Sequence, residues 1–205
     1  MSPKNFQEEV RIYKIDNKPR LDSIYEFYST FRHQFTREGL WLAVAGVRPS
    51  QVIGKRATVI TDDIFAAVQQ HVNQKGYIGT EKEDHQRRLP IMLLRQMADI
   101  VFNNYPEVIM LNNFQAIHTY IDRLKIKGFA EVAVYDAALR IGFIFNHLPD
   151  RIYLHAGVTK GARRLGLNIQ RQWMLKHEIE DIFGTIDIEP YELENFLCSR
   201  RDNFI

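Results

Sequence analysis

Apolar residues recur at steps of three and four along much of the chain, which is the spacing of one face of an α-helix. Such stripes lie within 21–35, 89–103, 113–124 and 132–145. Further helical segments are indicated at 61–76, 151–155, 173–183 and 190–197, and a basic helix is expected between Gly157 and Gly166. The strand–helix alternation of a parallel sheet does not occur. The sequence therefore predicts an all-α chain.

The expected helices are enough for one substantial core. A chain of 205 residues, 45% of them hydrophobic, can bury such a core in one domain. Residues 21–205 are predicted to form a single compact domain of many helices. Residues 1–20 are polar and mixed in charge, and we expect them to form an extended arm. The apolar run Leu40–Val47 has no clear period and fits either a buried helix or a short strand.

Charge is distributed unevenly along the sequence. The net charge is only +2, but the stretch from Arg123 to Lys176 contains ten Lys or Arg against three Asp or Glu. A local basic face of this kind can attract phosphate groups even though the whole chain is nearly neutral.

A short pattern lies in the most basic part of this stretch. Residues 154–165 read LHAGVTKGARRL, with glycines before and after Lys160. This pattern resembles the helix-hairpin-helix of DNA-repair proteins, in which a glycine-rich turn joins two helices. Residues Gly157, Val158, Lys160, Ala162 and Leu165 match the order of that hairpin. The sequence departs from it at Ala156, where the hairpin has proline, and at Thr159, where it has glycine, and the turn is one residue shorter.

The resemblance implies a nucleic-acid contact that does not depend on base sequence. Glycines let a backbone approach a phosphate closely, and the amides at the start of the next helix then point at the anion. The predicted phosphate-binding residues are Gly157, Val158, Thr159, Lys160, Gly161, Arg163 and Arg164, with Lys127 from a looser glycine turn at Gly128. The same residues also fit a plain glycine cap followed by an ordinary surface helix.

Some helix-hairpin-helix proteins are glycosylases, in which a hairpin lysine attacks the sugar and an aspartate further along the chain assists. Lys160 stands at the matching lysine position, but the aspartate motif and a four-cysteine tail are missing. The resemblance therefore favours backbone binding over glycosylase chemistry.

A second group of polar residues could form a pocket. Asp136 and Arg140 stand four apart in an apolar helix, a spacing that puts both on one face. Tyr153 and His155 lie just before the hairpin-like pattern. An enzyme acting on a small or nucleotide-like phosphorylated molecule would line its pocket with these four side chains and Lys160. Each also has an ordinary structural explanation, as a surface pair, a core residue or a cap.

Several classes of site are not supported. The sequence contains no serine-hydrolase elbow, Walker loop or dinucleotide-binding glycine motif, and no pair of histidines at zinc-helix spacing, so we expect neither a metal nor a cofactor. One cysteine, Cys198, favours a reducing compartment. With no signal-like start and no apolar run of membrane-spanning length, a cytoplasmic protein without membrane contact is expected.

Three hypotheses remain open from the sequence. The leading one is nucleic-acid backbone binding, with DNA or RNA as partner. The second is the enzyme described above, and the third is a helical module for protein–protein interaction.

Overall fold

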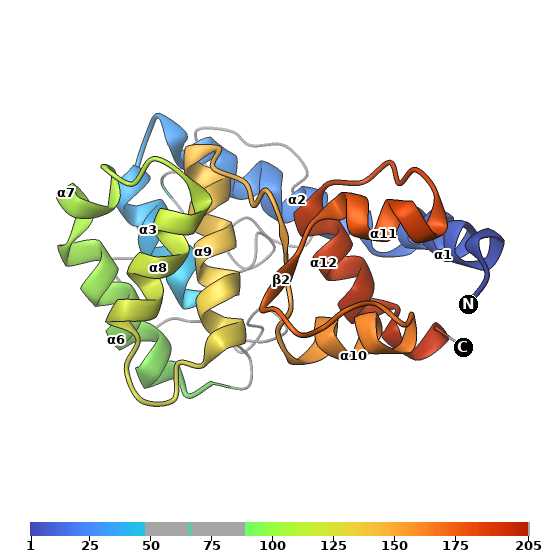
Figure 1. The fold of residues 1–205 in the computed structure, drawn as a ribbon. Coiled ribbons are helices and arrows are strands. Elements are labelled where there is room, and N and C mark those ends of the chain that lie inside the picture. The colour runs from blue at the N-terminus through green and yellow to red at the C-terminus, as the bar shows by residue number, and fades with distance from the viewer. Residues whose placement is uncertain (48–65, 67–88, 205) are drawn as a thin grey trace. The chain divides into compact units, whose positions relative to one another are not determined.

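The computed structural model describes residues 1–47, 66 and 89–204 (Figure 1). Ten α-helices lie in these ranges: α1 (Pro3–Asp16), α2 (Lys18–Ser29), α3 (Thr36–Ala45), α6 (Ile91–Asn103), α7 (Tyr105–Val108), α8 (Phe114–Leu124), α9 (Glu131–Phe145), α10 (Ala156–Arg164), α11 (Lys176–Phe183) and α12 (Pro190–Ser199). Two short strands, β1 (Ile152–Tyr153) and β2 (Trp173–Met174), and the 3-10 turns η1 (Thr30–Arg32) and η3 (Arg201–Asn203) complete them. The all-α prediction is confirmed. Apart from Ala66, the helix expected at 61–76 lies outside the described residues.

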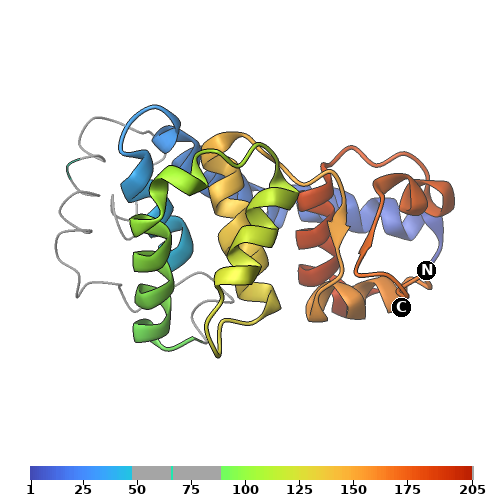
Figure 2. The ribbon, with the colours of Figure 1, turned by 60° about the vertical axis from the view of Figure 1, so that its left-hand side comes forward.

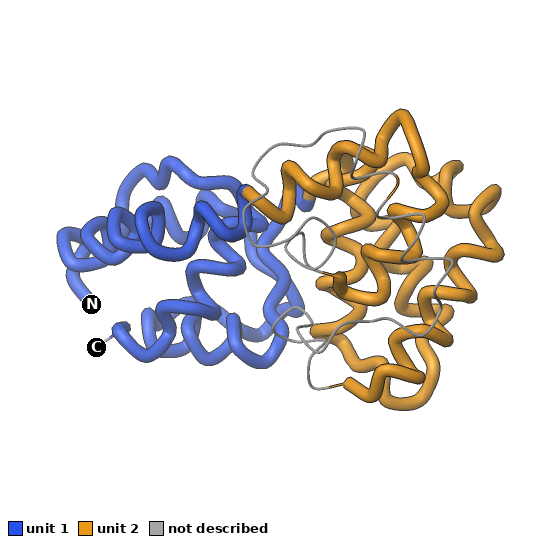
Figure 3. Tube along the Cα trace, turned by 180° about the vertical axis from the view of Figure 1, so that it is seen from behind, with its two compact units in different colours: residues 1–22, 149–205 blue, residues 23–148 orange. Residues whose placement is uncertain are grey.

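The chain divides into two compact units (Figure 3). Unit 1 contains both ends of the sequence, residues 1–22 and 149–205, and unit 2 contains residues 23–148. The division falls at residues 22 and 148, whereas the sequence predicted an arm over 1–20 and one helical domain over 21–205.

The extended arm expected at residues 1–20 is wrong, because this stretch is helical. Ser2 caps α1 by accepting a hydrogen bond from the amide of Asn5, and Pro3 occupies the first turn, where it is tolerated. Phe6, Val10 and Tyr13 follow at helical spacing and are all buried. The polar composition of this segment hid a narrow apolar stripe that belongs to the core of unit 1.

Helix α3 lies at the centre of unit 2, where it packs against α6 and α9, and α8 packs on α9 (Figures 1 and 2). All residues from Gly39 to Ala45 are buried, which explains why Leu40–Val47 has no amphipathic period. The helix ends at Gly46, whose φ of 70° is the left-handed conformation of a helix cap. Of the two structures that this run allowed, the structure shows the buried helix.

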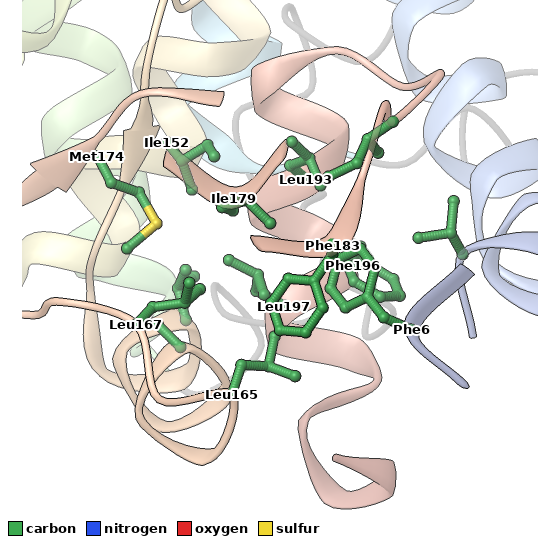
Figure 4. Close-up of a cluster of buried hydrophobic side chains, with 14 of the residues drawn as sticks. Phe6, Ile152, Leu165, Leu167, Met174, Ile179, Phe183, Leu193, Phe196 and Leu197 are labelled. Carbon is green, nitrogen blue, oxygen red and sulfur yellow. The ribbon is translucent and has the colours of Figure 1, made fainter. Parts of the chain in front are cut away.

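The core of unit 1 is assembled from distant parts of the sequence (Figure 4). Phe6 from α1 stacks on Phe183 from α11, with ring centroids 4.2 Å apart, and meets Phe196 from α12 edge-on at 5.4 Å. Ile152 and Met174 from the two strands join the same cluster. The N-terminal helix is therefore an integral layer of unit 1.

Two helix predictions in unit 1 are wrong in detail. The short helix expected at 151–155 is strand β1, which pairs with β2. The helix expected to begin at Trp173 begins at Lys176, because the carboxylate of Glu178 accepts a hydrogen bond from the amide of Leu175 at 2.7 Å and fixes the start there.

Candidate functional site

The strands β1 and β2 form a small ribbon with two different faces. They pair antiparallel, with Ile152 opposite Met174 and Tyr153 opposite Trp173. Because side chains alternate between the faces of a strand, Ile152 and Met174 both point into the core, while Tyr153 and Trp173 share the other face. Both aromatic side chains on that face are half-buried. Partial burial raises the pKa of the Tyr153 phenol to about 12, so it stays neutral at physiological pH.

Helix α10 follows the ribbon and also has two faces. Val158 and Ala162 are fully buried, four residues apart, on the side that packs against α12. Lys160, Arg163 and Arg164 are exposed at spacings of three and four, so they form one basic stripe on the opposite side.

The turn expected at Gly157 is wrong, because Gly157 and Gly161 both lie inside α10. A Cβ atom at Gly161 would come within 2.2 Å of the carbonyl oxygen of Leu197, and one at Gly157 within 2.5 Å of the Cys198 sulfur. These glycines therefore allow α10 and α12 to pack closely. They do not form a glycine hairpin, and the amides of residues 160–162 belong to the helix's own hydrogen bonds.

The predicted phosphate-binding residues fall into distinct groups. Val158 and Gly161 are buried, and the Thr159 hydroxyl donates to the Leu154 carbonyl at 2.8 Å. Lys160 and the two arginines after it, at positions 163 and 164, present charge to solvent. Lys127 is exposed too, but it belongs to unit 2, between α8 and α9.

All charged side chains of Lys, Arg, Asp and Glu type in α10, the ribbon and the residues between them are positive. The stretch from residue 151 to residue 177, called here the basic segment, contains six Lys or Arg and no Asp or Glu. Its bases are Arg151, Lys160, Arg163, Arg164, Arg171 and Lys176. The basic segment includes both strands of the ribbon, which the sequence did not reveal.

The carboxylates that pair with these bases come from outside the basic segment. Asp202 accepts hydrogen bonds from Lys160 at 3.2 Å and from Arg164 at 2.8 Å, and the bond from Lys160 holds the Asp202 pKa below its ordinary value. Arg171 pairs with Glu178. The Asp202 pairs are open to solvent, so they contribute little to stability and can be exchanged for another anion. The guanidinium of Arg163 makes no ion pair with any described residue.

Two arginines lie over the aromatic face of the ribbon. The guanidinium carbons of Arg151 and Arg171 are 4.7 and 4.9 Å from the centroid of the Trp173 ring, within the range of a cation–π contact. Arg151 is also held by Asp150 through two hydrogen bonds of 2.7 and 2.9 Å. The ring and its arginines combine a flat apolar surface with positive charge.

Four of the residues predicted to line a pocket are divided between the units. In unit 2, Arg140 is 4% exposed, donates to the Ala43 carbonyl at 2.8 Å and lies 3.9 Å from the Asp136 carboxylate. Arg140 therefore ties α9 to the end of α3. Tyr153 and His155 belong to unit 1, so the four residues do not lie in the same unit.

A buried ionic cluster in unit 1 was missed by the sequence reasoning. The Nε2 atom of His155 lies 2.5 Å from a carboxylate oxygen of Glu194, and both side chains are almost fully buried. Lys18 pairs with the buried Glu192 and, at 2.7 Å, with Asp22. Although burial lowers the pKa of Lys18, its hydrogen bonds to these carboxylates raise it overall. The cluster joins the N-terminal helices to α12.

The buried cluster is formed by residues from distant parts of the sequence. It pairs Lys18 with Glu192 and His155 with Glu194, residues too far apart in the sequence for a local pattern to reveal. Within the described ranges, no three His, Cys, Asp or Glu side chains are grouped in a way that could hold a metal ion. In the same ranges no helix has the length and apolar character needed to cross a bilayer.

Comparison of the chain with protein-family models, with curated proteins and with solved structures gives no match.

Proposed function

We propose that the chain binds the sugar–phosphate backbone of nucleic acid through the basic segment. The observation that carries this proposal is the exposed stripe of Lys160, Arg163 and Arg164 on α10, within 27 successive residues that contain no carboxylate side chain. Lysine and arginine contacts to phosphate oxygens provide affinity and orientation without reading base sequence.

The present ion pairs are compatible with that role. Asp202 holds Lys160 and Arg164 near each other, and both of their side chains are at least a third exposed. A phosphate can replace the Asp202 carboxylate because both offer oxygen acceptors to the same donors. Arg163 is available without such an exchange. The three side chains therefore offer phosphate oxygens a set of exposed donors on one helix.

The proposal is tested by a fluorescence anisotropy titration of the full chain with labelled DNA and RNA, each single-stranded and duplex, at two salt concentrations. We expect binding at low salt that weakens steeply as salt rises, because binding releases condensed counterions. Little difference between base sequences is expected. Absence of binding to every probe at low salt would end the proposal.

The two alternative hypotheses stay predictions. The enzyme hypothesis needs Asp136 and Arg140 to act together with Tyr153 and His155, and these pairs lie in separate units. The interaction-module hypothesis needs an apolar surface. Among the described residues of unit 2, the most exposed large apolar side chains are those of Met92, in the first turn of α6, and Met110, just after α7.

A further inference from the structure

The outer face of the ribbon, the face that carries Tyr153 and Trp173, combines aromatic rings with positive charge. Tyr153 and Trp173 stand opposite each other on this face, and the arginines at positions 151 and 171 lie against the tryptophan ring. Ile152 and Met174 anchor the other face in the core, so the ribbon holds its aromatic side chains on a fixed base. Phosphate binding alone requires no aromatic ring.

The aromatic ring and its arginines match the two parts of a nucleotide. A flat indole offers a surface on which any base can stack, and a neighbouring guanidinium group can bind a phosphate beside that base. Bases within a duplex are already stacked on one another, so only an unpaired base can use the ring. The chemistry of this face therefore fits a single strand better than a duplex.

We propose that the outer face of the ribbon is a base-stacking subsite for single-stranded nucleic acid, with Trp173 as its platform. This inference rests on the proposed function, because it adds a base contact to the backbone contact of α10. Arg171, which is 42% exposed, exchanges both the ring and its partner Glu178 for a phosphate, and a base takes its place on the ring. Arg151, held by Asp150, stays against the ring.

The experiment compares two single strands of equal length. One is oligothymidylate, and the other carries the same sugar–phosphate backbone with every base removed. The full chain is titrated with both at one low salt concentration, and anisotropy and tryptophan emission are recorded. The other tryptophan, Trp41, is 2% exposed and donates to Asp99 at 2.9 Å, so a change in emission reports on Trp173.

The expected result is a preference of the wild-type chain for oligothymidylate by about fivefold or more, the equivalent of one stacked base. Its tryptophan emission should be quenched by this strand and not by the abasic one. Trp173→Leu should bind both strands equally, at the affinity of the abasic strand. Trp173→Phe keeps an aromatic face and should keep part of the preference.

The outcomes separate the subsite from the proposed function. Equal binding of the two strands by the wild-type chain, with no quenching, would overturn the subsite and leave backbone binding in place. Failure to bind either strand would overturn both. If Trp173→Leu does not fold, the wild-type preference together with the emission change decides the question, since neither depends on the variant.

Arg171→Ala provides a second arm. Because Arg171 exchanges the ring for a phosphate, its removal should leave the preference for bases intact and lower the salt dependence of binding by about one phosphate contact. A loss of the base preference in this variant, with an unchanged salt dependence, would contradict the assigned roles.

Discussion

Gly161 shows at the scale of one residue why the hairpin was predicted and not found. A glycine is required both where a chain turns and where two helices touch, because each use depends on the missing Cβ. The sequence around Lys160 contains nothing that separates the two uses. The packing of Gly161 against the Leu197 carbonyl shows that this glycine serves the contact between two helices.

Gly161→Ala is therefore expected to destabilise unit 1. The new methyl group would meet a backbone oxygen of α12 at 2.2 Å, and overpacking of this kind costs about 1–3 kcal/mol of unfolding free energy. Urea denaturation measures the change. Arg163→Ala, at an exposed position of the same helix, is the matched control and should stay within about 0.5 kcal/mol. If Gly161→Ala were as stable as that control, the close packing of α10 and α12 would be refuted.

Asp202 is the second residue whose role can be tested alone. It accepts hydrogen bonds from Lys160 and Arg164 and so competes with phosphate for both. Asp202→Asn should strengthen nucleic-acid binding severalfold at low salt, because the competing charge is removed. The titration described above measures this effect. Unchanged or weaker binding would show that Lys160 and Arg164 do not contact the nucleic-acid backbone.

At the scale of elements, sequence reasoning was accurate where a long helix has one buried face. Helices α6, α8 and α9 lie close to their predicted positions, and the Asn113 side chain caps α8 by accepting a hydrogen bond from the Ala116 amide at 2.8 Å. The two-residue strands were missed because so short a segment carries no period. The ribbon is fixed by the pairing of β1 with β2, which are separated in the sequence by α10, and such pairing is a tertiary property.

Helix α1 allows a sharp test of its place in the core. Phe6 is fully buried and stacks on Phe183, so Phe6→Ala should lower the unfolding free energy by about 3–5 kcal/mol. Ile15, in the same helix, is 61% exposed, and Ile15→Ala should have almost no effect. Thermal and urea unfolding compare the two variants. Equal stability of the two would agree with the extended arm that the sequence suggested and would contradict the structure.

At the scale of the molecule, the first and last segments of the chain belong to the same unit. Residues 1–22 and 149–205 form unit 1, and the residues between them in the sequence form unit 2. Periodicity cannot show this arrangement, because it depends on which stripes meet. The same limit applies to the buried acids: Glu192 and Glu194 read as surface positions in a polar helix start, and only the distant Lys18 and His155 explain their burial.

The surface charges of unit 1 predict how its stability depends on pH. Hydrogen bonds from Arg151 to Asp150, from the Leu175 amide to Glu178, from Lys14 to Asp187 and from Lys160 to Asp202 lower the pKa values of four carboxyls. The unfolded chain then binds protons at a higher pH than the folded one. The contribution of these pairs to the free energy of unfolding should therefore be fully present above the ordinary carboxyl pKa values of 3.8 and 4.5. It should fall as the pH drops below them.

Thermal unfolding between pH 7 and pH 2 measures this dependence. The effect should be modest, because these carboxyls are largely exposed and salt screens them. In the double variant Asp202→Asn with Glu178→Gln the fall should be smaller. A melting temperature that rises on acidification would contradict these ion pairs.

The central claim, that the basic segment binds nucleic-acid backbone, is tested most directly by the salt dependence of binding. The affinity of the wild-type chain and of the triple variant Lys160→Ala, Arg163→Ala, Arg164→Ala for one single strand is measured over a series of salt concentrations. Arg11→Ala, another exposed base of unit 1, is the control. The proposal predicts a salt slope reduced by about one for each phosphate contact removed in the triple variant and unchanged in the control. Identical slopes in the wild-type chain and a folded triple variant would contradict it.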